Sequence, residues 1–303
     1  MLTVTLARNA MATRFEIVLH GEDAARLRAA GEEALDEIER LESQLSLYRP
    51  SSEIARLNAG GFAHPLKLSP AVFRLLQQAQ TLSRETAGAF DITVAPLVRC
   101  WGFMGGGGRK PSPAELDAAR AQVGLEHLRL DESDFTAGFD VAGAMLDLGA
   151  IGKGYAIDCA VEILREAGVT SALVHGGSST VYGLGQPPGG AAWQIAIQNP
   201  PGVDLGAVVG LRDSALSVSA GWGKSFTLDG KTYGHVFDPR LGRPVEGCLV
   251  AAVGLPSATE TDAFSTALLV DGLARHDQIA SLRPGMATLA VSPGHEVKSR
   301  LIL

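Results

Sequence analysis

Asp262 and Thr266 are residue types that suit the binding of a divalent cation. They are four residues apart, so on a helix they lie one above the other on the same face. A carboxylate and a hydroxyl are hard oxygen donors of the kind that Mg²⁺ prefers, and Mg²⁺ keeps other positions for water and phosphate. The alternative is a hydrogen bond between the two residues on an exposed helix face.

The segment from Asp147 to Asp158 contains the glycine-rich stretch GAIGKG. Its glycines allow backbone amides to face a ligand at the start of a helix, where the helix dipole favours an anion. Lys153 adds a positive charge in the first helical turn, where it opposes the dipole. An anionic partner for Lys153 is therefore expected. The alternative is a solvated lysine in a capping turn.

A histidine and an aspartate three residues apart, His235 and Asp238, precede Pro239. They could orient each other for acid–base catalysis, or His235 could be a structural histidine with satisfied hydrogen bonds.

Asp91 lies between apolar residues and close in sequence to aromatic ones. This pattern fits either a wall for a flat ring or a buried turn aspartate in an aromatic core. The aromatic residues concerned are Phe90, Trp101 and Phe103.

The segment 45–58, LSLYRPSSEIARLN, carries several hydroxyls together with Tyr48 and Asn58, just after an expected helix. Its alternative interpretation is a capped helix followed by a polar loop.

Common catalytic motifs are absent. Asp147 stands where a Walker loop needs glycine, and Gly154 stands where it needs serine or threonine. The segment 176–180 lacks the last glycine of a nucleophile elbow, and there is no HExxH.

Amphipathic helices are expected around these clusters. Leu27, Ala34 and Leu41 belong to a three- and four-residue apolar repeat that predicts a long helix over about 22–46. Punctuating residues predict further helices, because caps, Pro and Gly mark helix ends. Five further helices are expected. The first begins at Ser69-Pro70 and stops before Gly88, and the second runs from a capping box at Ser112 to Gly124. The others span about 153–167 before Gly168, from a capping box at Ser257 to about 271, and about 273–282.

Strands are expected between these helices. Phe15, Ile17 and Leu19 alternate with more polar residues before Gly21, which predicts a strand with one buried face. Asp229-Gly230 predicts a hairpin with a type I′ turn. The other strands are expected at about 127–150, 171–177, 193–198, 206–212, 214–219, 248–255 and 287–291. Helices and strands come in mixed order without a βαβ period, which favours an α+β fold with mostly antiparallel sheets.

Composition limits the class of protein. The chain has 303 residues, enough to bury a core without metals or disulfides, and is expected to form a single unit over 1–303, with two closely packed lobes as an alternative. Lys and Arg number 26 against 33 Asp and Glu, so the formal net charge of −7 argues against nucleic acid as a partner. Three widely spaced cysteines argue against a disulfide framework. No apolar run is long enough for a membrane span, and no signal peptide is apparent, so a cytoplasmic protein is expected.

Taken in chain order, these clusters resemble the FAD:protein FMN transferase family of the ApbE type, formerly called thiamine biosynthesis lipoproteins. The resemblance runs from Met11 to about Gly272, nearly the whole chain. Several long motifs in the right order carry it: MAT at 11–13, SLYRPSSEIARLN at 45–58, GAFDITVAPLVRCWGF at 88–103, LDLGAIGKGYAID at 146–158, DGKTYGHVFDPRLGRPV at 229–245 and ATETDAFSTALLVDG at 258–272.

The resemblance implies a T-fold-like ApbE architecture that binds FAD as substrate. It implies cleavage of the FAD pyrophosphate, transfer of FMN to a Thr or Ser hydroxyl of an acceptor protein, and release of AMP. Asp262 and Thr266 would bind Mg²⁺ with a backbone carbonyl, taken as that of Ala150, with Mn²⁺ as an alternative ion. His235, Lys153 and Asp262 would be catalytic. The FAD site would be lined by Met11, Tyr48, Asn58, Asp91, Lys153, Asp158 and His235.

The chain departs from the family pattern at three positions. Ser178 replaces an aspartate, and Val218 and Ala220 replace other residues in a Ser-Thr-Ser-Gly segment. The acceptor is expected to carry a Ser/Thr-Gly-Ala-Thr-like motif. Two alternatives to transfer stay open: an FAD pyrophosphatase that uses water and releases FMN and AMP, and an FAD-binding protein without turnover. The general base is also open between His235 and a carboxylate.

Overall fold

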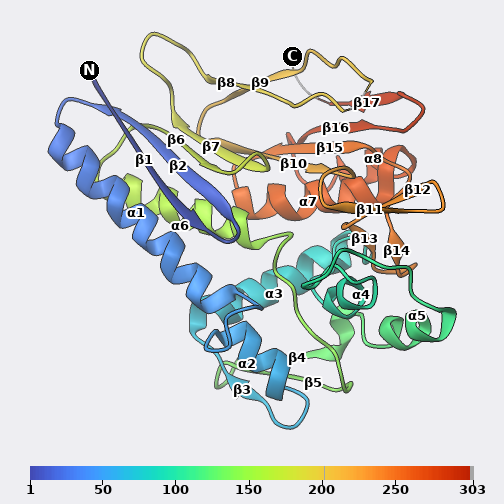
Figure 1. The fold of residues 1–303 in the computed structure, drawn as a ribbon. Coiled ribbons are helices and arrows are strands. Elements are labelled where there is room, and N and C mark those ends of the chain that lie inside the picture. The colour runs from blue at the N-terminus through green and yellow to red at the C-terminus, as the bar shows by residue number, and fades with distance from the viewer. Residues whose placement is uncertain (201, 301–303) are drawn as a thin grey trace.

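An eight-stranded antiparallel sheet forms the centre of the molecule. The computed structural model describes residues 1–200 and 202–300, and Figure 1 shows its ribbon. Each strand pairs antiparallel with its neighbours, which confirms the predicted α+β fold with mostly antiparallel sheets. In spatial order the strands are β1 (Leu2–Ala10), β2 (Thr13–Gly21), β6 (Ser171–Gly176), β7 (Thr180–Gly185), β10 (Ser214–Ala220), β15 (Val250–Leu255), β16 (Ala287–Val291) and β17 (Val297–Ser299).

Three helices cover one face of this sheet (Figure 1). They are α1 (Ala24–Leu45), α6 (Gly152–Glu166) and α7 (Ala258–Asp271). Asp23 caps α1 by accepting hydrogen bonds from two backbone amides of the first turn, as an N-cap should. The predicted buried faces of α1 and α6 are confirmed, because Leu27, Leu41 and Ile157 lie in the main apolar core. The α7 helix lies between the sheet and its neighbouring helices, so ten of its 14 residues are buried.

The opposite face of the sheet is covered by a separate two-stranded sheet, β8 (Trp193–Ala196) and β9 (Val208–Leu211). Alternate residues of β15 divide between the two faces. Ala251 and Val253 belong to the core on the helix side, whereas Val250 and Ala252 pack with Trp193 of β8. Because both faces are covered, the strand reads as a continuous apolar run, as the sequence predicted.

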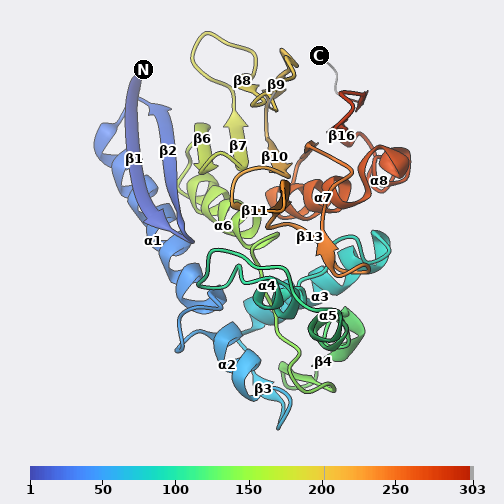
Figure 2. The same cartoon turned by 45° about the vertical axis from the view of Figure 1, so that its right-hand side comes forward.

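A second group of helices and short strands lies beyond α1, α6 and α7, toward the lower end of the molecule in Figures 1 and 2. It contains a three-stranded sheet in the order β3–β5–β4. These elements are α2 (Glu53–Gly60), β3 (Leu66–Lys67), α3 (Pro70–Glu85), α4 (Ala95–Cys100), α5 (Pro113–Arg120), η1 (Leu125–His127), β4 (Leu128–Asp131) and β5 (Thr136–Phe139). The predicted capping box at Ser112 is confirmed, with both reciprocal hydrogen bonds to Glu115 present.

The remaining elements follow β10 in the chain, and two of them, η2 (Gly272–Ala274) and α8 (His276–Ile279), contact α7. The predicted hairpin is confirmed: β11 (Ser225–Leu228) and β12 (Lys231–Gly234) flank Asp229 and Gly230, whose φ angles are 52° and 75°. Both angles suit a type I′ turn. The others are β13 (Phe237–Asp238) and β14 (Arg243–Pro244).

Several predicted elements are wrong. The strand expected to continue to 150 ends at Phe139. Residues 146–151, LDLGAI, form a loop held by side-chain and turn hydrogen bonds instead of a strand ladder, and the GKG that follows begins α6. The last helix is divided into η2 and α8 at Arg275, whose backbone angles (φ −114°, ψ 15°) are not helical. Strand β1 and helices α2 and α4 were not predicted.

Two predicted caps differ in detail. Ser69 makes no side-chain cap on α3; its hydroxyl and backbone amide donate to Glu53. Ser257 does cap α7, but the Glu260 carboxylate binds Arg283 and so does not complete a capping box. The single unit expected over 1–303, or two packed lobes, stays a prediction, and residues 201 and 301–303 lie outside the described part.

The cysteines and the helices give two further results. Cys100, Cys159 and Cys248 are free thiols, consistent with the predicted lack of a disulfide framework. Among the helices of the described residues, none is both long enough and apolar enough to cross a membrane.

Candidate active site

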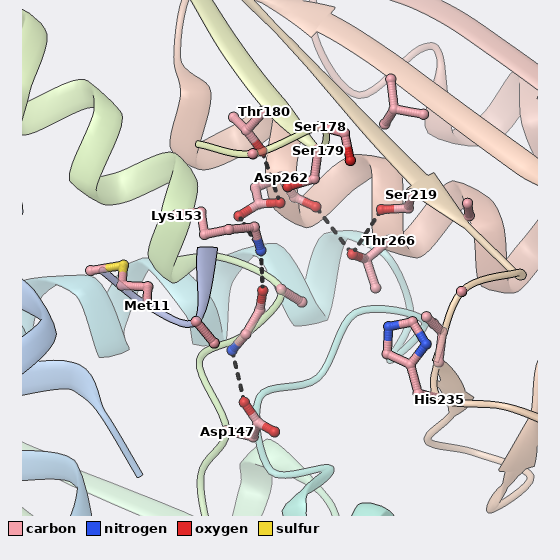
Figure 3. A pocket seen from close by; sticks show the side chains of 18 of the residues that line it. Met11, Asp147, Lys153, Ser178, Ser179, Thr180, Ser219, His235, Asp262 and Thr266 are labelled. Carbon is pink, nitrogen blue, oxygen red and sulfur yellow. Dashed lines mark hydrogen bonds and ion pairs between the residues drawn. The ribbon is translucent and has the colours of Figure 1, made fainter. Parts of the chain in front are cut away.

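A cavity of about 920 Å³ lies where the β6–β7 turn, the start of α6 and helix α7 meet. This volume is within the usual range of about 300–1,000 Å³ for ligand pockets. Figure 3 shows its polar part, where Lys153, Asp262 and Thr266 point toward one another. The cavity is the structural feature that brings the separate sequence clusters together.

Asp262 and Thr266 lie on the cavity side of α7, as predicted from their spacing. Asp262 is only 4% exposed, so the alternative of a pair on an exposed helix face is wrong. Its Oδ2 accepts a hydrogen bond from the Gly154 amide at 3.1 Å, and its Oδ1 accepts one from the Thr180 hydroxyl at 3.4 Å. Thr266 donates its hydroxyl proton to the backbone carbonyl of Asp262 at 3.2 Å.

Lys153 occupies the first turn of α6, as the sequence predicted. Its Nζ donates to the carbonyl of Gly149 at 2.9 Å and lies 4.0 Å from Asp262 Oδ2. Ala150, in the same loop, also lines the cavity. The loop therefore places one cation and several backbone groups beside the carboxylate.

Asp147 is a cavity residue that the sequence reasoning did not select. Its Oδ1 accepts from the Gly149 amide at 2.8 Å, and its backbone amide donates to the carbonyl of Ile92. Burial raises the pKa of the Asp147 carboxyl, while the Gly149 amide and the charges of Lys153 and His235 oppose that rise. Its place near the start of the LDLGAIGKG motif was the available signal.

The oxygen atoms at the polar end fit a divalent cation bound together with substrate phosphates. The predicted ligands are the Asp262 carboxylate, the Thr266 hydroxyl and the Ala150 carbonyl, and all three residues line the cavity. The described residues contain no cluster of three or more His, Cys, Asp or Glu side chains that could hold a metal by themselves. One carboxylate with neutral oxygens suits Mg²⁺, which usually relies on phosphates and water for its other positions.

His235 lies at the wall of the same cavity, on the other side of Thr266 from Lys153 (Figure 3). Its Nδ1 donates to the carbonyl of Lys224 at 3.1 Å, and since a carbonyl only accepts, this bond leaves Nε2 as the unprotonated nitrogen. Although part of the ring is exposed, partial burial lowers the pKa of His235 below 6.5. The positive charges of Lys224 and Lys153 act in the same direction.

The predicted pairing of His235 with Asp238 is wrong. Asp238 is buried, and its carboxylate accepts hydrogen bonds from the backbone amide and guanidinium of Arg240. Arg240 also binds Asp271 at the end of α7 at 2.8 Å. These contacts attach the segment that carries His235 to α7.

Asp91 lines the cavity, but local groups use its carboxylate. Oδ1 accepts from the amide and hydroxyl of Thr93, and Oδ2 accepts from the amide of Leu125. The expected aromatic wall does not form, because Trp101 and Phe103 are buried in a separate apolar cluster. The structure therefore favours the turn-aspartate interpretation of this segment.

Met11 and Tyr48 line the cavity as predicted, and Tyr48 is 67% exposed at its mouth. Asn58 and Asp158 do not line it. The Asn58 side chain exchanges two hydrogen bonds with the backbone of Leu146 and so holds the loop that leads to Asp147. The Asp158 carboxylate accepts four hydrogen bonds from residues 257–259 at the start of α7. Both residues lie outside the cavity and hold in place the loop and the helix that line it.

The cavity also extends to the outer face of the sheet, which the sequence reasoning missed. There it is lined mainly by apolar side chains of the sheet and of β8, because alternate strand residues point away from α6 and α7. All three positions that depart from the family pattern line it as well. The outer part includes Leu173, Val181, Ile195, Leu216, Val218 and Trp222, and the departing positions are Ser178, Val218 and Ala220.

The fold and the cavity define an α+β protein with one large, partly apolar ligand site that has oxygen donors and a lysine at its polar end. The model of the ApbE family matches residues 11–290. The FAD:protein FMN transferase of Salmonella typhimurium is 32% identical over 297 residues, covering 93% of this chain and 82% of that protein. The enzyme of the same name from Vibrio cholerae is 34% identical over 251 residues, covering 80% of this chain and 73% of that protein.

Solved structures agree with the sequence comparison. The ApbE protein of Thermotoga maritima superposes with a TM-score of 0.90 at 27% identity, covering 98% of this chain and 97% of that one. The apo form of the flavinyl transferase ApbE of Pseudomonas stutzeri gives a TM-score of 0.84 at 30% identity, covering 98% and 94%. This chain belongs to the ApbE family, and the predicted resemblance is confirmed.

Proposed function

We propose that this protein is an FAD:protein FMN transferase. It cleaves the pyrophosphate of FAD, transfers FMN to a Thr or Ser hydroxyl of an acceptor protein and releases AMP. The observation that carries the proposal is the meeting of Lys153, Asp262 and Thr266 at the polar end of one large cavity, in a chain whose relatives bear this name. Phosphoryl transfer requires mainly positioning and charge stabilisation, which such a site supplies.

Each residue at the polar end of the cavity has a role that follows from its position. Lys153 places a positive charge where the phosphates would bind, whereas the amides of Gly149, Ile151 and Gly152 donate to acceptors within the loop itself. His235, with Nε2 free of a proton, accepts the proton of the acceptor hydroxyl. Asp262, Thr266 and the Ala150 carbonyl would hold Mg²⁺, with Mn²⁺ as an alternative, and the bound ion would neutralise charge on the phosphates and the leaving AMP.

Met11, Tyr48 and Asp91 contribute to the FAD site as cavity walls, together with Lys153 and His235. In this proposal Asn58 and Asp158 act indirectly, through the loop and helix that they hold. The acceptor presents a Ser/Thr-Gly-Ala-Thr-like motif at the cavity mouth. The cytoplasmic location expected from the sequence stays a prediction.

FAD hydrolysis is the second candidate, because the exposed edge of His235 lets water reach the position that an acceptor hydroxyl would occupy. Water would then take the phosphoryl group, and FMN and AMP would both be released. The same residues would serve both reactions, so only products distinguish them.

The test is an incubation of the purified protein with FAD, with and without Mg²⁺ and with and without an acceptor. AMP release that needs both Mg²⁺ and acceptor, with FMN covalently attached to the acceptor on a denaturing gel, would support transfer. Free FMN and AMP without acceptor would support hydrolysis instead. Intact FAD in every tube would contradict both enzymatic proposals and favour an FAD-binding protein. The Asp262→Ala variant should release no AMP under any of these conditions.

A further inference from the structure

Three buried hydroxyl groups connect the strands of the central sheet to Asp262. Thr180 of β7, Ser217 of β10 and Thr261 of α7 are each no more than 2% exposed. Ser217 Oγ lies 3.2 Å from Thr180 Oγ1 and 2.7 Å from Thr261 Oγ1. Thr180 in turn contacts Asp262 Oδ1 at 3.4 Å, so the hydroxyls form an unbroken chain that ends on the carboxylate.

The chemistry of the groups fixes the direction of this chain. Each hydroxyl has a single proton to donate, whereas an ionised carboxylate only accepts. Thr180 therefore gives its proton to Asp262 and accepts one from Ser217. Ser217 also contacts Thr261, whose hydroxyl donates to the carbonyl of Ala258, 2.9 Å away.

The second oxygen of Asp262 is held independently. The Gly154 amide donates to Oδ2, so each carboxylate oxygen has one donor, and the two donors come from different elements. Two donors on two oxygens define the plane of the carboxylate. A carboxylate has about four lone-pair sites, so this arrangement leaves capacity on both oxygens for a cation in the cavity.

We infer that Thr180 and Ser217 are positioning residues that, anchored by Thr261, orient the Asp262 carboxylate for the divalent cation. The inference rests on the proposed function only in taking Asp262 as a cation ligand. A buried hydrogen bond of this kind adds only about 0.5–1.5 kcal/mol to folding, so its main effect here is on orientation. Partners behind a metal ligand typically change metal affinity by about 10–100-fold.

The test is a titration of the full-length protein with Mn²⁺ alone, with free Mn²⁺ followed by electron paramagnetic resonance. Thr180→Val removes the donor to Asp262 but keeps the side-chain shape, and should weaken Mn²⁺ binding by about 10–100-fold. Thr180→Ser keeps the hydroxyl and should bind Mn²⁺ nearly as the wild type does. Ser217→Ala should weaken binding less than Thr180→Val, because Thr180 keeps its own proton for Asp262.

Thr288→Val is the matched control. Thr288 is a fully buried threonine of β16 whose hydroxyl contacts His276, outside the cavity, so its loss affects stability without affecting Asp262. Thermal unfolding followed by circular dichroism establishes that each variant is folded. If Thr180→Val does not fold, the comparison of Ser217→Ala with Thr288→Val decides the question.

Three outcomes would overturn the inference. The first is a folded Thr180→Val variant that binds Mn²⁺ as tightly as the wild type. The others are an equal loss of Mn²⁺ affinity in Thr180→Ser and Thr180→Val, and equal Mn²⁺ affinities in Ser217→Ala and Thr288→Val. A wild-type protein that binds no Mn²⁺ would overturn it as well. Failure of the proposed function would look different. In that case the expected order of Mn²⁺ affinities would hold, but FAD would remain intact with every acceptor.

Discussion

Helices α6 and α7 touch at Gly154, which makes this residue a sensitive point for both stability and activity. A Cβ atom added at Gly154 would lie 2.1 Å from the carbonyl oxygen of Ala258 and 2.9 Å from the Cα of Thr259. Both neighbours are backbone atoms, so they cannot move aside as the end of a side chain could. The Gly154→Ala variant must therefore separate the helices by about 1 Å in an interior packed at crystal-like density.

The expected cost follows from this clash. Overpacking a close-packed interior usually costs about 1–3 kcal/mol, and a rigid backbone neighbour favours the upper end. Replacing a helical glycine with alanine returns up to about 1 kcal/mol through intrinsic propensity. We expect Gly154→Ala to lower the free energy of unfolding by about 2 kcal/mol, measured by urea denaturation.

Activity should fall as well, because the amide of Gly154 donates to Asp262. A displacement of about 1 Å at a reacting site can reduce the rate by about 100-fold, and AMP release from FAD measures it. Gly152→Ala in the same helix is the control, since a Cβ there meets nothing closer than Leu148 Cβ at 3.8 Å. Equal stability and equal AMP release in the two variants would refute the reasoning.

Three further outcomes are expected. AMP release should fall in acid with a midpoint below pH 6.5, because partial burial lowers the pKa of His235 and the neutral ring accepts the proton; a midpoint above 6.5 in the pH–rate profile would contradict this. Arg240→Ala leaves the buried carboxylate of Asp271 with Arg275, 3.4 Å away, as its remaining ion-pair partner. The variant should lower the free energy of unfolding, measured by urea denaturation, by about 2–3 kcal/mol. An unchanged free energy of unfolding would show that Arg275 is a sufficient partner. Asp158→Ala removes four hydrogen bonds from the start of α7 and should cost about 2 kcal/mol, checked by the same method, with an unchanged unfolding midpoint as the contrary result.

Local sequence patterns predicted the helices and strands that bury one face against neighbouring elements and expose the other. The alternation of Phe15, Ile17 and Leu19 identified β2, because these residues are fully buried while their neighbours are not. The spacing of Asp262 and Thr266 placed both residues on the cavity side of one helix. In these cases the periodicity of a single element determines which side chains share a face.

Features that depend on distant contacts were not predictable in this way. Asn58 contacts Leu146, 88 residues away, and Asp158 contacts Thr259, 101 residues away, so nothing local distinguishes them from cavity residues. Residues 146–151, LDLGAI, have the composition of a strand, but their amides bond within the loop, to Ile92 and to Asn58 instead of to a neighbouring strand. The apolar outer part of the cavity depends on where β8 lies, which the pattern of β8 itself does not specify.

The lining of the cavity limits the composition of any molecule that fills it. Residues 177–180 of the β6–β7 turn line the same cavity as the polar residues of α7 and the apolar residues that pack with β8. A molecule that contacts both kinds of lining needs a charged part joined to an apolar part, and FAD combines a pyrophosphate with a flat flavin ring in this way.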